Sequence, residues 1–473
     1  MGINGSYVMG TLPLCSGDIN GKKRANGQGD AASDALALQL PAAITLCDMI
    51  SATFFMRSLV MRRIRPLSFS LLFAAFSLTA ASLPSSKPED VGLSSERLQR
   101  IHALVQRHMD LGDITGAVVL VARKGQIAFV EADGTMDVET KKPMARDSVF
   151  RMASMTKPVI GTAIMMMLEE GKLQLGDPVS KYISEFKNMK VAVPQEAGGR
   201  GAVNPPKFYT VPAEHDITIK DLLTHTSGLS SGPMGQSEVA KNRRKPTETL
   251  ADYVPRLGST PLEFQPGSRW MYSPSDGFDV LARIVEVASG VPLDRFLKQR
   301  VFDPLDMPNT SHYPTDAQMP RLVTAYQKTA KGLVKTENSL SMSSKVYFAG
   351  GGGLVSTIDD YSHFAQMLAN GGELNGKRLL SPRTVKLLSS VHIPSTLPGR
   401  TTGEGFGLSV RVMQDAIAGN HRVSDGSFGW SGAYGTHFWI DPKEEIVAVM
   451  MIQTPIREMR PEFENAVMQA IVK

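Results

Sequence analysis

The fold is decided by the stretch Phe150-Arg151-Met152-Ala153-Ser154-Met155-Thr156-Lys157, which runs directly into an apolar segment. Residues three apart share one face of a helix, so the Ser154 hydroxyl and the Lys157 amine are expected side by side at a helix start. A serine hydroxyl is a weak nucleophile until a base takes its proton. A lysine in a dry site can lose its charge and help to do so. The stretch is therefore compatible with Ser154 as a nucleophile assisted by Lys157.

The serine–lysine spacing has a second reading, because a serine at this position is also a common N-cap residue of a helix. The segment Ser184-Glu185-Phe186-Lys187 has the same spacing but opens no apolar helix, so we predict no chemistry there. Spacing alone therefore leaves the cap and the nucleophile open, and further motifs must decide between them.

Four further segments follow the Ser154 stretch in a fixed order. They are Asp221–Leu229 (DLLTHTSGL), Phe264–Ser273 (FQPGSRWMYS), Gly350–Thr357 (GGGGLVST) and Gly432–Pro442 (GAYGTHFWIDP). With FRMASMTK they resemble the motifs of class C β-lactamases, penicillin-binding proteins and the related family VIII carboxylesterases, over roughly residues 85–473. The resemblance implies an α/β (α+β) fold: an antiparallel sheet built from the N- and C-terminal segments and flanked by helices. It also implies a mostly helical insertion over roughly residues 160–345.

Catalytic roles follow from the resemblance, position by position. Tyr272 matches the family's tyrosine and would share a proton with Lys157 as the base for Ser154. The backbone N–H groups of Ser154 and Ala433 would form the oxyanion hole. Trp430 and Gly432 would contact the substrate, since a glycine lets the strand edge approach an acyl group closely. Taken without Ser154, Tyr272 would read as a packed, half-buried tyrosine.

Two departures from the family pattern bear on the substrate. Pro274 stands where the lactamases have an asparagine, and Trp430 stands where they have the lysine of Lys-Thr-Gly. A site without that amide and that cation favours a neutral ester over a charged β-lactam or a D-Ala-D-Ala peptide. We therefore expect a serine hydrolase that cleaves carboxylic esters of short to medium acyl chains. The alternatives are a β-lactamase or D-Ala-D-Ala-type peptidase, an acyltransferase on the same scaffold, and a catalytically dead cell-wall binding protein.

Other candidate residues are interpreted structurally. Ser230 lies in a G-x-S-x-G pattern, but that nucleophile elbow needs a preceding strand and a following helix, and we expect a loop there. We expect His225 to be a buried, hydrogen-bonded residue, and His437 to pack in a strand beside the site, with a contact to the substrate as the alternative. The nine histidines form no H-E-x-x-H pattern and no nucleotide-binding glycine motif occurs, so the sequence predicts neither a metal nor a cofactor.

Charge and composition limit the kinds of binding partner and the cellular location that can be expected. Of the formal net charge of +5, residues 1–81 carry +3, so the rest of the chain is nearly balanced and predicts no nucleic-acid binding. Residues 56–82 combine an arginine-rich head, an apolar run and small residues, the layout of a signal peptide. We expect residues 1–55 to be an extension before the true start, and residues 83–473 to be the hydrolase domain, periplasmic or secreted and without stable membrane insertion. Both cysteines, Cys15 and Cys47, precede that domain, which excludes a cysteine nucleophile from it.

Periodicity predicts the main elements of the body. We expect helices over 95–109, 154–170, 278–289, 359–370 and 461–472, and strands over 118–122, 126–130, 435–440 and 446–452. Residues 187–215 and 230–262 show little periodicity and are expected to be long loops. Nothing in the sequence predicts the oligomeric state.

Overall fold

The computed structural model describes residues 83–195, 205–336 and 345–473. They belong to one compact unit that reaches the C-terminus at Lys473. The expected N-terminal extension (1–55), the expected signal peptide (56–82) and both cysteines lie outside the described residues, so these predictions stay predictions.

The core of the fold is an eight-stranded sheet in which every neighbouring pair is antiparallel. In spatial order its strands are β12 (Glu404–Phe406), β13 (Arg411–Met413), β14 (Phe428–Ser431), β15 (His437–Asp441), β16 (Ile446–Met451), β1 (Gly116–Arg123), β2 (Gln126–Asp137) and β3 (Lys142–Pro143). The β1–β16 pair joins the N-terminal strands to the C-terminal ones, with Leu120 opposite Val449. The predicted sheet built from both ends of the domain is confirmed.

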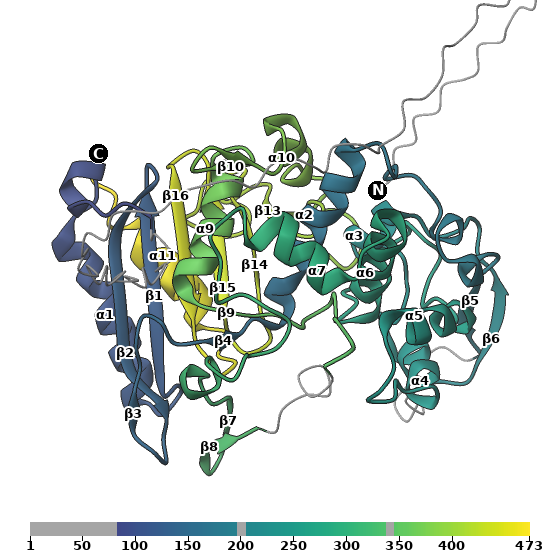
Figure 1. Ribbon diagram of the computed structural model, residues 1–473, viewed down its shortest axis with the longest axis horizontal. Coiled ribbons are helices and arrows are strands. Elements are labelled where there is room, and N and C mark those ends of the chain that lie inside the picture. Colours follow the sequence, from purple (N-terminus) through teal and green to yellow (C-terminus); the bar gives the residue numbers. More distant parts are fainter. Residues whose placement is uncertain (1–82, 196–204, 337–344) are drawn as a thin grey trace, which may run out of the picture. The chain divides into compact units, whose positions relative to one another are not determined.

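Both faces of the sheet are covered, and strand β1 shows how. Val118 and Leu120 point into the larger apolar core, whereas Val119 and Val121 point into a smaller one. Helices α1 (Ser95–Asp110) and α11 (Met459–Met468) pack on the smaller core, and α2 (Thr156–Glu169) and α9 (Ile358–Ala369) pack on the larger core (Figure 1). Because side chains alternate along a strand, such a doubly covered strand is apolar throughout, and all eight residues of β1 are buried.

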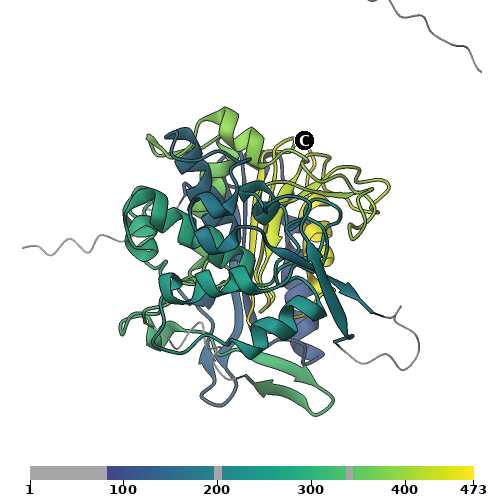
Figure 2. The ribbon, with the colours of Figure 1, turned by 90° about the vertical axis from the view of Figure 1, so that its right-hand side faces the viewer.

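The described residues of the segment between α2 and α9 contain more helix than strand, together with long irregular stretches. Its helices are α3 (Ile219–Leu223), α4 (Pro233–Lys241), α5 (Leu250–Tyr253), α6 (Asp276–Ser289) and α7 (Leu293–Leu297), and α10 (Pro382–Leu388) follows α9. Short strand pairs accompany them: β4 (Phe150–Arg151) with β9 (Val355–Ser356), β5 (Lys190–Pro194) with β6 (Phe208–Pro212), β7 (Tyr326–Thr329) with β8 (Gly332–Lys335), and β10 (Glu373–Leu374) with β11 (Lys377–Arg378). Figure 2 shows the β5–β6 and β7–β8 ribbons standing apart from the main sheet.

Most predicted elements are confirmed to within a few residues. The Ser94 side chain caps α1 by accepting a hydrogen bond from Arg97 N–H, and Gly290 ends α6 with a left-handed φ of 73°. The loop prediction for 187–215 and 230–262 was wrong, because these segments contain β5, β6, α4 and α5. Among the described residues, no helix is long and apolar enough to span a membrane.

Candidate active site

The turn that presents Ser154 is held from both sides. The Met152 N–H donates to Leu354 O at 2.9 Å, and Leu354 N–H donates to the Thr156 hydroxyl at 3.1 Å. Between these anchors Ala153 has a φ of 44°, a left-handed conformation that costs an alanine free energy and persists only where the surroundings impose it. The turn therefore places Ser154 at the start of α2, where it is half-buried, rather than capping the helix from outside.

Lys157 lies one turn further along α2 and is completely buried. Its Nζ lies 3.2 Å from Ser154 Oγ and donates to the carbonyl oxygens of Pro274 and Gly351, both at 2.6 Å. The Gly351 peptide is itself fixed, because its N–H donates to Asp279 Oδ1 at 2.9 Å. Two carbonyls thus aim the lysine nitrogen at the serine, and Pro274 serves through its backbone oxygen.

Tyr272 completes the group, although it lies more than a hundred residues further along the chain. Its hydroxyl lies 2.6 Å from Ser154 Oγ, and Lys157 Nζ lies 5.1 Å from the centre of its ring. The structure therefore brings together the three residues that the sequence proposed as catalytic. A phenol oxygen, an amine and the serine hydroxyl share one hydrogen-bonded cluster.

An aromatic wall surrounds this cluster, with His225 at its centre. The His225 ring lies 4.7 Å from the Tyr272 ring, centre to centre, and its Nδ1 accepts a hydrogen bond from Ser273 N–H. The other rings within about 6.4 Å of it belong to Trp270, Phe278, Phe406 and Trp430. Burial, followed by the charges of Lys157 and Arg400, lowers the pKa of His225 well below its ordinary value, so the ring is neutral. His225 is therefore buried and hydrogen-bonded through its Nδ1, as the sequence predicted.

The turn between β14 and β15 forms the other side of the nucleophile. Gly432 N–H donates to Thr436 O at 2.7 Å, and the Thr436 hydroxyl donates to Met152 O at 3.3 Å. A Cβ at position 432 would collide with Met152 O, so only glycine allows the two backbones this approach. Ser154 and Tyr272 line a cavity of about 230 Å³ together with Trp430, Gly432 and Ala433. All six residues that the sequence assigned to the site thus lie in or beside one cavity.

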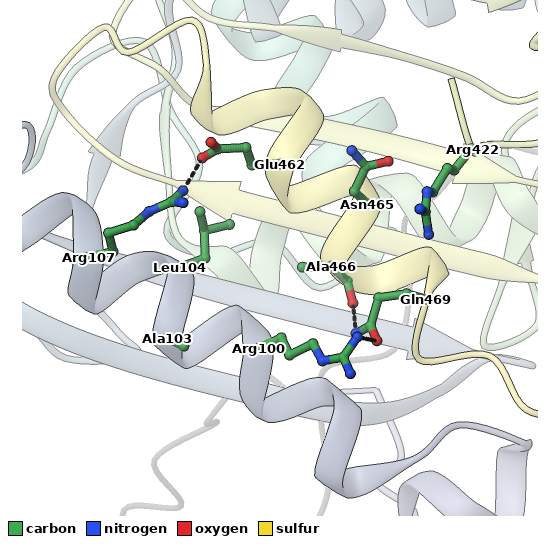
Figure 3. A pocket seen from close by; sticks show the side chains of 9 residues that line it. All are labelled: Arg100, Ala103, Leu104, Arg107, Arg422, Glu462, Asn465, Ala466 and Gln469. Carbon is green, nitrogen blue, oxygen red and sulfur yellow. Dashed lines mark hydrogen bonds and ion pairs between the residues drawn. The ribbon is translucent and has the colours of Figure 1, made fainter. Parts of the chain in front are cut away.

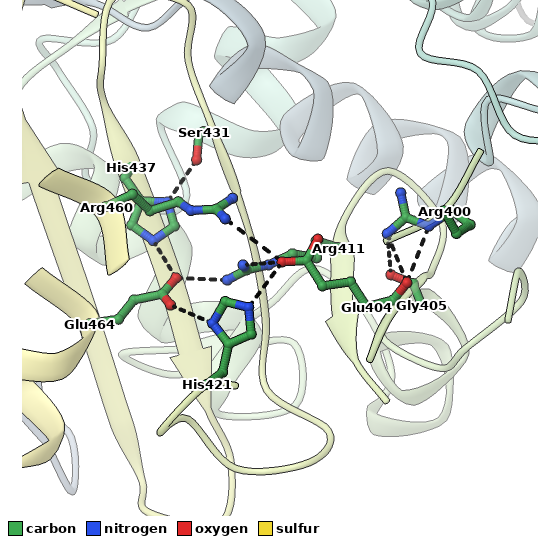
Figure 4. A network of polar contacts seen from close by, with 9 residues as sticks. All are labelled: Arg400, Glu404, Gly405, Arg411, His421, Ser431, His437, Arg460 and Glu464. Carbon is green, nitrogen blue, oxygen red and sulfur yellow. Dashed lines mark hydrogen bonds and ion pairs between the residues drawn. The ribbon is translucent and has the colours of Figure 1, made fainter. Parts of the chain in front are cut away.

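The sequence missed the polar network that forms the remaining wall. Ser431, His437, Arg411 and Arg460 line the same cavity, and behind them lie Glu404, His421 and Glu464 (Figure 4). Arg411 donates to Glu404 at 2.9 Å and to Glu464 at 2.7 Å, and it is buried. Trp430 leaves the cavity without a cation at position 430, but Arg411 and Arg460 reach the same cavity from other parts of the chain.

The ionisation of this polar network follows from its contacts. Burial alone would raise the pKa of Glu464, but Arg411 and two histidines outweigh it and hold that pKa well below its ordinary value. Hydrogen bonds to Glu404 and Glu464 raise the pKa of His421 to about 9. Burial lowers the pKa of His437, so this histidine is neutral although it contacts Glu464. The charge of the buried Arg411 is thus compensated by the two carboxylates that flank it.

Other candidate residues lie elsewhere. Ser184 is exposed, whereas Ser230 is buried, follows α3 rather than a strand, and so lacks the elbow geometry. The expected loop after Ser230 was wrong, since α4 begins at Pro233. A cavity of about 510 Å³ opens between α1 and α11, lined by Arg100, Arg107 and Arg422 among others, and contains none of the predicted site residues (Figure 3).

Within the described residues, one group could hold a metal ion. His102 Nδ1 lies 3.0 Å from Glu131 and 3.5 Å from Asp133, on the α1 side of β2. All three side chains are partly exposed, an arrangement that is common for surface groups without a bound ion.

Comparison with known proteins gives the family. The family model described as Beta-lactamase matches residues 101–473. The chain belongs to the Beta-lactamase family. It is 34% identical over 369 residues to Protein Rv1367c of Mycobacterium tuberculosis, covering 74% of this chain and 88% of that protein. It is 28% identical over 423 residues to esterase EstB of Burkholderia gladioli, covering 84% and 97%.

Two further similar proteins bear on the type of reaction. A putative D-alanyl-D-alanine carboxypeptidase of Escherichia coli K12 is 26% identical over 416 residues, covering 82% of this chain and 90% of that one. The solved structure of EstCE1, described as a hydrolase with promiscuous acyltransferase activity, superposes with a TM-score of 0.66 at 28% identity, covering 79% and 99%. This Beta-lactamase family protein is therefore a serine hydrolase, near the family VIII esterases.

Proposed function

We propose that the protein hydrolyses carboxylic esters of short to medium acyl chains through an acyl-enzyme on Ser154. The observation that carries the proposal is the shared hydrogen-bonded cluster, with Tyr272 Oη at 2.6 Å and Lys157 Nζ at 3.2 Å from the serine oxygen. Both groups lie within the reach that proton transfer requires.

The Lys157–Tyr272 pair acts as one base. A neutral amine would give its two hydrogens to the Pro274 and Gly351 carbonyls and turn its lone pair to Ser154, with Tyr272 as a neutral phenol. An ammonium beside a phenolate satisfies the same contacts, and it differs from the first form only in the place of one proton. Either form has room for the serine proton.

The reaction then runs in two balanced steps. Ser154 Oγ bonds to the ester carbonyl carbon while its proton moves to the pair; the carbon–oxygen bond to the alcohol breaks, and the pair returns the proton to the leaving oxygen. In the second step, water bonds to the acyl carbon while one of its protons moves to the pair. The bond between the acyl carbon and Ser154 Oγ then breaks, and the pair returns the proton to Ser154, which releases the acid and restores the serine. The N–H groups of Ser154 and Ala433 are proposed to stabilise the oxyanion in both steps.

The cavity supports a small acyl group. Its volume of about 230 Å³ and the Trp430 surface suit a short, apolar chain. The esterase EstB supports an ester as substrate, and EstCE1, a hydrolase with promiscuous acyltransferase activity, supports acyl chemistry at this kind of site. A β-lactam or D-Ala-D-Ala peptide is the competing substrate class, supported by the carboxypeptidase-named relative.

A side-by-side panel tests the proposal. p-Nitrophenyl acetate, butyrate and octanoate, nitrocefin and a D-Ala-D-Ala peptide are offered to wild type and Ser154→Ala. We expect the highest kcat/KM for acetate or butyrate and loss of turnover in Ser154→Ala, with Ser180→Ala as a control serine remote from the cluster. Retained ester turnover in Ser154→Ala would show that Ser154 is not the nucleophile. Faster turnover of nitrocefin than of the esters would show that a β-lactam is the preferred substrate.

A further inference from the structure

A second cavity adjoins the one that contains Ser154. It has a volume of about 500 Å³ and reaches Pro455, Ile456 and Arg457. Five residues line both cavities, namely Ser431, Gly432, Ala433, His437 and Arg460. The end of β14 and the start of β15 therefore form the junction where an approaching molecule passes from one cavity to the other.

A buried hydrogen-bond chain starts at this junction. The Ser431 hydroxyl lies 2.8 Å from His437 Nδ1, and His437 Nε2 lies 3.2 Å from Glu464 Oε1 (Figure 4). His437 and Glu464 are both buried, whereas Ser431 is half-buried with its oxygen at the cavity end of the chain. The ester-cleaving cluster of Ser154, Lys157 and Tyr272 does not use these three residues.

The direction of every hydrogen bond in the chain can be deduced. Glu464 accepts from Arg411 at 2.7 Å and is ionised, so it can only accept, and His437 Nε2 must carry the hydrogen. Since burial keeps His437 neutral, its Nδ1 has a lone pair and accepts from the Ser431 hydroxyl. The Ser431 hydrogen is thereby committed to His437. Toward the cavity the serine oxygen can only accept a hydrogen bond.

We propose that Ser431 is a positioning residue that holds the hydrolytic water of the second half-reaction, with His437 and Glu464 fixing its polarity. The proposal rests on the proposed function. Water has two hydrogens, so one can bind Ser431 while the other goes to the Lys157–Tyr272 pair as the oxygen attacks the acyl carbon. An alcohol has one hydrogen and cannot satisfy both. The junction therefore selects water over alcohols and favours hydrolysis over acyl transfer.

The test separates the two half-reactions. With p-nitrophenyl butyrate and added 1-butanol, p-nitrophenol release reports acylation, and the yields of butyric acid and butyl butyrate report how the acyl-enzyme partitions. Ser431→Ala is expected to lower kcat for hydrolysis about tenfold, the loss of one hydrogen bond to a polar transition state. The acylation rate should change less than about twofold, an initial burst of p-nitrophenol should appear, and the butyl butyrate share should rise.

Paired variants distinguish the loss of the Ser431 hydroxyl from a general loss of protein stability. Ser431→Thr keeps the hydroxyl and should restore wild-type partitioning, whereas Ser431→Val has the same shape without it and should behave like Ser431→Ala. Ser427→Ala changes a buried serine just before β14 and should leave the kinetics unaltered. Unchanged partitioning in both Ser431→Ala and Ser431→Val would overturn the proposal, as would equal loss of acylation and hydrolysis. If wild type lacked esterase activity altogether, the proposed function would fail instead.

Discussion

One wall of the Ser154 cavity is aromatic, whereas the next contains ionised groups, with Arg411, Arg460 and His421 against the carboxylates of Glu404 and Glu464. On the aromatic side, neutral His225 packs against Tyr272, and Lys157 bonds to two carbonyls and the Ser154 hydroxyl beside the Tyr272 and Phe278 rings. The polar network holds Arg411 between two carboxylates. The groups proposed to exchange a proton and the groups that stay ionised thus lie in different walls of one cavity.

The largest effect is expected in the Ser154 cluster that the aromatic wall surrounds. Lys157→Met keeps an unbranched apolar stem but removes the amine, so kcat/KM for p-nitrophenyl butyrate should fall at least about 10³-fold. Fluorophosphonate labelling of Ser154 should slow with it. Lys377→Met, at an exposed lysine of β11, is the matched control. Near-normal turnover would show that the buried amine takes no part in proton transfer.

Tyr272→Phe tests the second proposed member of the base, and we expect a somewhat smaller loss of activity. It removes the hydroxyl 2.6 Å from Ser154 and keeps the ring packed on His225. We expect kcat/KM to fall about 10²-fold or more, with the melting temperature little changed. A phenylalanine variant as active as wild type would leave Lys157 as the sole base.

Glu464→Gln tests the polar network through stability. The substitution leaves Arg411 and His421 with too little negative charge in a buried place. Breaking a buried charge pair typically costs about 3 kcal/mol, which denaturant unfolding would measure. Glu458→Gln, on an exposed glutamate near the start of α11, should be neutral within about 0.5 kcal/mol. Equal stability of the two variants would mean that the charges are solvated after all.

His421→Gln gives the smallest and most pH-dependent effect. The pKa of His421 is raised from 6.5 to about 9 by Glu404 and Glu464, so its contribution is fully present below pH 6.5 and lost as the pH rises through about 9. Since the side chain is partly solvated, we expect less than about 1 kcal/mol. Unfolding free energies of wild type and variant should therefore differ at about pH 6 and converge above about pH 9. A difference that grew with pH would contradict the assignment.

The sequence predicted the parts of the fold and site that depend on local pattern. Apolar periodicity located α1, β1, α6 and α9, and the ordered motifs pointed to Ser154, Lys157 and Tyr272 before their contacts were known. β5 and β6 were missed because each has five residues, ends at a proline and lies in a stretch rich in glycine and lysine, where alternation is too short to stand out.

The polar network was missed for a different reason. Arg411 and Glu464 are 53 residues apart, on a strand and on a helix. Neither belongs to a local motif, and a lone arginine or glutamate is ordinarily a surface residue. Only the packing of α11 beside the sheet makes them partners. His437 was seen and assigned to packing, but its contacts with Ser431 and Glu464 depend on the same tertiary arrangement.

The close approach of Gly432 to Met152 has a consequence for how the molecule gains its activity. The turns that it joins are tied by a hydrogen bond spanning 284 residues. Closing so long a loop costs entropy that only the nearly finished sheet repays. Catalytic competence should therefore arrive late in refolding, after most secondary structure has formed, so that a half-folded chain carries no reactive serine.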